Sequence, residues 1–202
     1  MLSVAGNGSI GDFPDSDTPI ARLLTFYRAH HAGIAGGGLL LHWAAFFFAF
    51  FAVAVWARVR DSGVHPLVGG AILVGAAVDF AQQLSSASVY STLGFIGGKQ
   101  VIAPAALQAW HVNGSGGGLS TGEGGLAVML LALAAAGIAG GALPRWLSWT
   151  ALPLGILQLT PIGFYAEMLF LLWAAVAGVY MTFRPIARSA YASTATPLAV
   201  SS

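Results

Sequence analysis

Long apolar runs, separated by short polar or proline-containing segments, dominate the chain between Gly33 and Phe183. A helix needs about 20 apolar residues to cross a hydrocarbon core about 30 Å thick. Helices can cross because they satisfy their own backbone hydrogen bonds. The pattern therefore predicts an all-α integral membrane bundle of five transmembrane helices. The expected spans are residues 33–57, 66–88, 123–143, 147–160 and 163–183.

A shorter amphipathic segment, residues 18–31, precedes the first predicted span. Thr18 is the expected N-cap and Pro19 occupies the first turn, where a missing N–H costs nothing. Apolar side chains of this segment fall on one helical face, namely Ile20, Leu23, Leu24 and Tyr27. This pattern predicts a helix that lies on the membrane surface.

A long outer loop is expected between the second and third spans. Within it, Ala103 to His111 predicts a short interfacial or re-entrant helix with Pro104 in its first turn. The membrane domain is expected to cover residues 18–186. Residues 1–17 and 187–202 are small and polar and are predicted to be flexible tails.

The composition supports a membrane protein and excludes several other classes. Hydrophobic residues make up 57% of the chain and charged residues 7%, whereas soluble domains have about 25% charged residues. The formal net charge of +1 and the lack of a basic run predict no nucleic-acid partner. The absence of cysteine excludes disulfides and thiolate metal sites. The lipid bilayer is therefore the first expected partner.

The distribution of basic residues predicts the orientation. With five spans, one side of the membrane carries Arg58, Arg60, Arg145, Arg184 and Arg188, and the other side carries Arg22, Arg28 and Lys99. The positive-inside rule then predicts an external N-terminus and a cytoplasmic C-terminus. The abundance of Ala and Gly is typical of a GC-rich bacterial genome, so we expect the bacterial plasma (inner) membrane.

Polar side chains within the spans concentrate in the outer half of the predicted bundle. His42 and Asp79 each lie nine residues from the outer end of their spans, roughly 13 Å deep. Because a lone carboxylate in hydrocarbon costs several kcal/mol, Asp79 needs a partner, and we expect it to be His42. The predicted polar intramembrane cluster is His42, Asp79, Gln82, Gln83, Gln158 and Glu167. Glu123, His111 and Tyr165 are predicted at its outer mouth.

A simpler alternative assigns these residues no function beyond packing. Asp79, Gln82 and Gln83 would then only join helices, at about 0.6 kcal/mol per hydrogen bond. The spacing of the histidines matches no metal motif, so no metal, haem or other cofactor is predicted. No base is visible beside Ser91, Ser120 or Thr121, so a serine hydrolase is not predicted either.

The stretch "GALPRWLSW", from Gly141 to Trp149, resembles a turn found in small uncharacterised multi-pass membrane proteins of actinobacteria. Those proteins often have glycine at the position of Ser148. The resemblance covers about the last third of the chain and implies a glycine-rich span followed by two closing spans. Pro144 would end the third span, and Arg145 would mark its cytoplasmic side. The resemblance carries no activity.

We expect the protein to be non-enzymatic, as an accessory or scaffold subunit of a larger bacterial membrane assembly. The chain is short and shows no inverted repeat of broken helices, the feature typical of many transporters. Other membrane proteins, or further copies of the chain, are the expected protein partners. An alternative is a small oligomeric channel or transporter that moves protons or a small solute through the outer polar cluster. A second alternative is an intramembrane redox or metal-binding subunit that uses His42 and Asp79.

Overall fold

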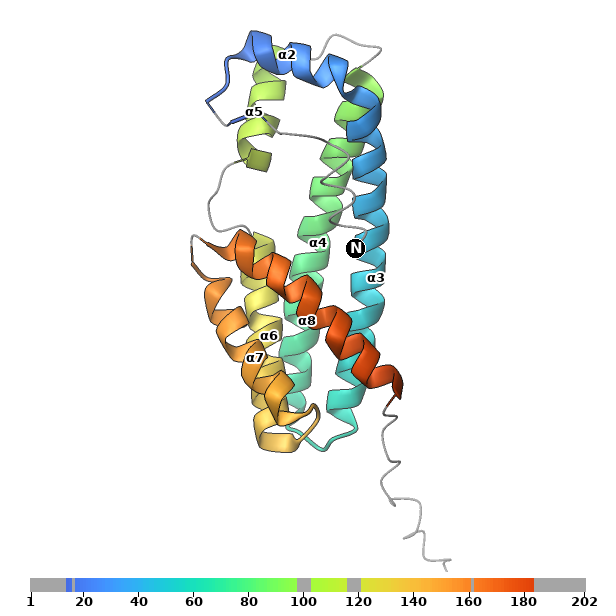
Figure 1. Cartoon of the computed structure of the whole chain (residues 1–202), viewed down its shortest axis with the longest axis vertical. Coiled ribbons are helices and arrows are strands. Elements are labelled where there is room, and N and C mark those ends of the chain that lie inside the picture. The colour runs from blue at the N-terminus through green and yellow to red at the C-terminus, as the bar shows by residue number, and fades with distance from the viewer. Residues whose placement is uncertain (1–13, 16, 98–102, 116–120, 161, 184–202) are drawn as a thin grey trace, which may run out of the picture.

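The computed structural model describes residues 14–15, 17–97, 103–115, 121–160 and 162–183, and in this part every element is a helix (Figure 1). The prediction of an all-α fold is confirmed there. Four of the helices are long and apolar enough to cross a membrane: α3, α4, α6 and α8. In chain order the helices are α2 (Ile20–Ala29), α3 (His31–Arg60), α4 (Pro66–Gly97), α5 (Pro104–Ser115), α6 (Thr121–Gly140), α7 (Arg145–Leu157) and α8 (Gly163–Phe183).

Helix α7 is the exception to the predicted set of five spans. It has 13 residues and is therefore about 20 Å long, less than the thickness of a hydrocarbon core. It also contains Pro153, which removes one backbone hydrogen bond from the helix. The described residues thus establish four candidate spans, and a fifth is not confirmed.

Helices α3 and α4 form a long antiparallel hairpin. Glycines hold its upper part close together: a Cβ placed on Gly38 would lie 2.6 Å from the backbone nitrogen of Ser91, and one on Gly94 would overlap the backbone of Ala35. Small residues allow such close approach of helices. The helix of the second predicted span does not end near Ser88, because α4 continues without a break to Gly97.

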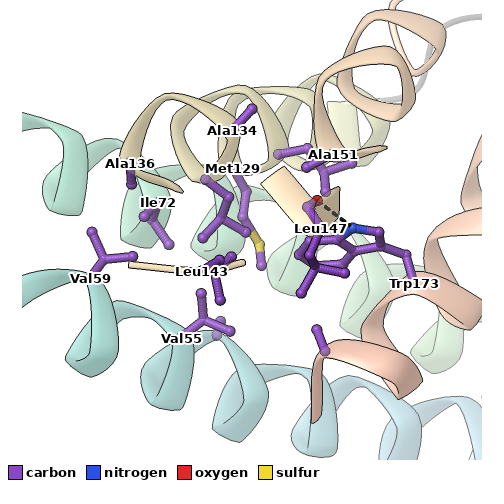
Figure 2. Close-up of a cluster of buried hydrophobic side chains, with 14 of the residues drawn as sticks. Val55, Val59, Ile72, Met129, Ala134, Ala136, Leu143, Leu147, Ala151 and Trp173 are labelled. Atoms are coloured by element: carbon purple, nitrogen blue, oxygen red, sulfur yellow. Dashed lines mark hydrogen bonds between the residues drawn. The ribbon is translucent and has the colours of Figure 1, made fainter. Parts of the chain in front are cut away.

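Helices α6, α7 and α8 pack around the lower part of this hairpin (Figure 1). α7 runs antiparallel to α6, since Ser148 fills the space beside Gly137 and Gly155 contacts Leu131. Aliphatic side chains from the packed helices form the main core, in which the indole N–H of Trp173 donates to the Leu147 carbonyl at 3.1 Å (Figure 2).

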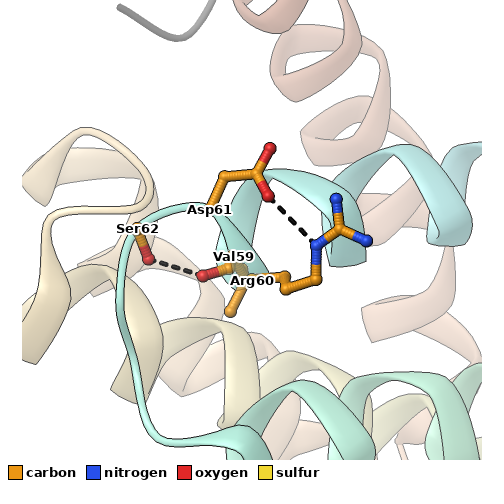
Figure 3. Close-up of polar contacts among 4 residues, drawn as sticks. All are labelled: Val59, Arg60, Asp61 and Ser62. Carbon is orange, nitrogen blue, oxygen red and sulfur yellow. Dashed lines mark hydrogen bonds and ion pairs between the residues drawn. The ribbon is translucent and has the colours of Figure 1, made fainter. Parts of the chain in front are cut away.

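Basic residues stabilise one end of the bundle, here called the arginine end (Arg58, Arg60 and Arg145). Arg58 donates through Nε to the carbonyl of Ala142 at 3.2 Å and lies over the ring of Tyr180. It therefore joins α3 to the α6–α7 turn and to α8. In the turn after α3, Arg60 pairs with Asp61 at 3.0 Å, and the Ser62 hydroxyl donates to the Val59 carbonyl at 2.6 Å (Figure 3).

The opposite end of the hairpin carries a second, smaller unit that we call the cap (α2, α5 and the ends of α3 and α4). A Cβ on Gly122, in the first turn of α6, would lie 2.9 Å from Gln82 Cγ. The 15 residues from Gln82 to Gly97 (97 − 82) therefore extend about 22 Å beyond α6. The cap has its own core of Leu23, Tyr27, Ile34, Leu93 and Leu107.

The cap corrects two predictions and supports a third. The apolar face of α2 is covered by protein, with Leu23 and Tyr27 buried, so this face does not lie on lipid as predicted. The N-cap position is Pro19, without a side-chain hydrogen bond, and not Thr18. The predicted short helix in the loop is present as α5 and begins at Pro104.

Candidate functional site

Acidic side chains from α4, α6 and α8 lie near one another at the cap end of the bundle. Glycines of α6 bring that helix against Asp79. A Cβ on Gly122 would lie 3.2 Å from Asp79 Oδ1, and one on Gly125 would lie 2.8 Å from the Asp79 backbone nitrogen. Any larger residue at these positions would displace the carboxylate or its helix, so the glycines determine how closely α6 approaches Asp79.

Asp79 is buried, with 6% of its surface exposed. Its Oδ2 accepts a hydrogen bond of 2.6 Å from the side-chain amide of Gln83, one helical turn away. An amide supplies a donor but no positive charge. The carboxyl group of Asp79 interacts electrostatically with that of Glu167 on α8, and Glu167 interacts in the same way with Glu123 on α6. The three helices thus contribute an acid each to the cap end of the bundle, where their charges influence one another.

The start of α8 borders this group of acids. A Cβ on Gly163 would lie 3.1 Å from the carboxyl carbon of Glu123 and 3.2 Å from the backbone carbonyl of Gln158. The side chain of Gln158 is fully buried, and neither of its amide atoms has a hydrogen-bond partner. Gln158 follows α7 on the same side as Ser148, Ala151 and Gly155, the buried residues through which α7 packs on α6. A buried polar group without a partner costs about 1–3 kcal/mol.

His42 does not lie beside Asp79, contrary to the prediction. Its Nδ1 donates to the carbonyl of Gly38 at 2.9 Å, and its Nε2 is 3.3 Å from the hydroxyl of Ser88. Ser88 is nine residues from Asp79 (88 − 79), about 13 Å along α4. The prediction counted the depth of Asp79 from a helix end at Ser88. Because α4 continues to Gly97, the residue of α4 opposite His42 is Ser88 and not Asp79. At the level of Asp79, α3 instead presents Phe46, whose ring packs near Phe80.

His42 and Asp79, the two residues named for the alternative of a redox or metal-binding subunit, therefore lie about 13 Å apart along the α3–α4 seam. Within the described ranges, no group of three or more His, Cys, Asp or Glu side chains is arranged to hold a metal ion.

His111 lies in the cap and not at the mouth of this acidic group. It is buried in α5, where Nε2 donates to the carbonyl of Asp15 at 2.9 Å and Nδ1 is 3.5 Å from the hydroxyl of Tyr27. Burial, with a smaller contribution from Tyr90, raises the pKa of Tyr27 well above its usual range. Tyr165 is largely exposed on α8.

The structure thus brings together five of the predicted residues, Asp79, Gln82, Gln83, Glu123 and Glu167, and places Gln158 at the border of the group. We call the three acids with Gln83 the carboxylate cluster. Sequence reasoning missed Ser88, because nothing in the sequence indicates that it lies opposite His42. No family model, curated protein or solved structure matches this chain.

Proposed function

We propose that the protein crosses a bacterial plasma membrane five times, with α7 as a short fifth crossing. Figure 1 supports this. The end of α6 and the start of α8 lie at opposite ends of the bundle, and α7 runs from one to the other. The turn after α7 adds length, and a bilayer thins around a short segment at modest cost. Arg58, Arg60 and Arg145 favour a cytoplasmic arginine end. The cap and the N-terminus are then external, and the C-terminus is cytoplasmic.

We further propose that the carboxylate cluster takes up protons or a small cation from the cap side of the membrane and passes them into the bundle. The observation that carries this proposal is the buried carboxyl group of Asp79 beside the first turn of α6, a turn that also holds the carboxyl group of Glu123 against the start of α8. Two negative charges in such surroundings repel strongly and are poorly solvated. A proton or a cation between them relieves both costs, so the site has a physical reason to bind one.

The arrangement also provides a direction of entry. Glu123 lies in the first turn of α6, at the cap end of the bundle, and Glu167 connects it electrostatically to the buried Asp79. Carboxyl groups placed at the entrance and inside the bundle give a proton or a cation successive sites to occupy. The broken segment formed by α7, with Pro153 and the partnerless Gln158, adjoins the cluster, and interrupted helices line the sites of many transporters.

The test is a flux measurement on the purified full chain in proteoliposomes loaded with a pH-sensitive dye. Wild-type vesicles should conduct protons faster than empty vesicles under an imposed potential, and Asp79→Asn should abolish the difference. Asp61→Asn is the matched control, because it removes an exposed acid at the arginine end and should leave the flux unchanged. Wild-type vesicles that are no leakier than empty ones, for protons and for monovalent cations, would refute the proposal.

A second candidate function, the accessory or scaffold subunit expected first from the sequence, is favoured by the cap. A hairpin that extends about 22 Å beyond α6 and carries its own core provides a surface outside the bilayer for another membrane protein or another copy of the chain. Purification in mild detergent should then recover a partner in fixed stoichiometry. Leu107→Ala, which removes a fully buried side chain of the cap core, should release it. A chain that always purifies alone and monomeric would exclude this role.

A further inference from the structure

The contact between Ser88 and His42 has the geometry of a nucleophile with its base. The Ser88 hydroxyl lies 3.3 Å from Nε2 of His42 across the α3–α4 seam. The other ring nitrogen, Nδ1, is 2.9 Å from the carbonyl oxygen of Gly38. A carbonyl only accepts hydrogen bonds, so Nδ1 carries the proton in the neutral ring and Nε2 offers its lone pair to Ser88. A hydroxyl, a base and a group that orients the base are the parts of an activated serine.

We propose that Ser88 and His42 form a catalytic dyad that hydrolyses carboxylic esters at the membrane surface. A distance of 3.3 Å is long for a hydrogen bond, but such bonds are often long in unliganded enzymes and shorten when substrate binds. Gly38 acts as a positioning residue, because its carbonyl fixes the tautomer and the orientation of the imidazole.

The position of the dyad selects the substrate. Ser88 is exposed and lies six residues beyond Gln82 (88 − 82), about 9 Å past the first turn of α6. The interfacial layer of a bilayer extends about 5–8 Å beyond each side of the hydrocarbon core, so Ser88 lies at the outer limit of this layer and faces the ester groups of lipids from its water side. Leu39 and Trp43, close to His42 on α3, are 56% and 55% exposed and offer an apolar wall to an acyl chain. The substrate class is therefore a lipid-borne ester.

The proposed reaction balances with water as the second substrate. Ser88 Oγ adds to the ester carbonyl carbon while its proton passes to His42 Nε2. The bond to the alcohol oxygen then breaks, and the alcohol leaves with that proton. Water adds to the acyl-serine and gives a proton to Nε2, and the carboxylic acid departs as Ser88 recovers its hydrogen.

The first test is covalent labelling of the purified full chain in detergent micelles with a fluorophosphonate probe. The probe should attach to Ser88, as read by peptide mass on the wild-type protein, which needs no variant. Ser88→Ala should lose the label, and His42→Gln should slow it about 100-fold, the contribution expected of a general base. Ser85→Ala, an exposed serine on the same helix, is the matched control and should label normally. Absence of label on Ser88, or equal labelling of wild type and His42→Gln, would overturn the dyad.

The second test separates the possible sources of the ester. Wild-type protein in vesicles of diacyl phosphatidylglycerol should release fatty acid, and Ser88→Ala should not. A water-soluble short-chain ester should be cleaved more slowly. Cleavage of the soluble ester with none of the lipid would overturn the assignment of a lipid substrate, and cleavage of neither would overturn the activity as a whole. These readouts are independent of the Asp79 flux, so failure of one proposal is distinguishable from failure of the other.

Discussion

The closest helix contact at the candidate site, between α4 and α6, can be tested with Gly125→Ala. The new Cβ would lie 2.7 Å from the Gly75 carbonyl oxygen and 2.8 Å from the Asp79 backbone nitrogen. Ordinary contact begins at 3.4 Å, so the two helices must separate by about 0.7 Å (3.4 − 2.7). Both atoms belong to the backbone and cannot rotate away. Overpacking of this kind costs about 1–3 kcal/mol.

The neighbouring Gly124→Ala is the matched control, because a Cβ there meets no atom within 4 Å. Alanine is better than glycine inside a helix by about 1 kcal/mol, and both variants gain this. We therefore expect Gly124→Ala to stabilise the protein by about 1 kcal/mol. Gly125→Ala should range from neutral to about 2 kcal/mol destabilising.

The assay is reversible unfolding of each variant in mixed micelles with increasing mole fraction of SDS, followed by the helical circular dichroism signal. The expected gap in unfolding free energy between the two variants is about 1–3 kcal/mol, which is the cost of overpacking alone. If Gly125→Ala were as stable as Gly124→Ala, the close approach of α4 and α6 would be refuted. The placement of α6 against Asp79 would be refuted with it.

Two further predictions concern the core and the cap. Trp173→Phe removes the 3.1 Å hydrogen bond to the Leu147 carbonyl and should lower the free energy of unfolding by at least about 0.6 kcal/mol in the same assay. Trp149→Phe, at an exposed position, should cost nothing measurable. Equal effects of the two substitutions would contradict the buried position of Trp173. Because burial raises the pKa of Tyr27 above its usual 10.0, its contribution to stability should be fully present below pH 10 and decline as pH rises further, since the unfolded tyrosine ionises first. Thermal unfolding followed through that range should show a smaller alkaline loss for Tyr27→Phe, and an identical loss in both proteins would refute burial of Tyr27.

Local patterns were sufficient to predict the class of fold. Apolar runs of about 20 residues identify α3, α4, α6 and α8, because crossing a bilayer sets a minimum length that the sequence displays directly. Pro104 identified the start of α5 for a similarly local reason. Asp79, Glu123 and Glu167 were singled out because acids are costly inside an apolar bundle, whatever its packing.

The sequence alone also determined that Arg58, Arg60 and Arg145 lie at one end, since alternating helices place them there. Only the tertiary structure decided that α4 continues to Gly97, where Val89 and Leu93 pack in the cap core with residues of α2 and α3. It also decided that Asp79 meets α6, while His42 meets Ser88. The register between helices depends on where glycines such as Gly38 and Gly125 allow backbones to touch. That is a property of two segments together, and a shift of one helical turn changes every polar pair along the seam.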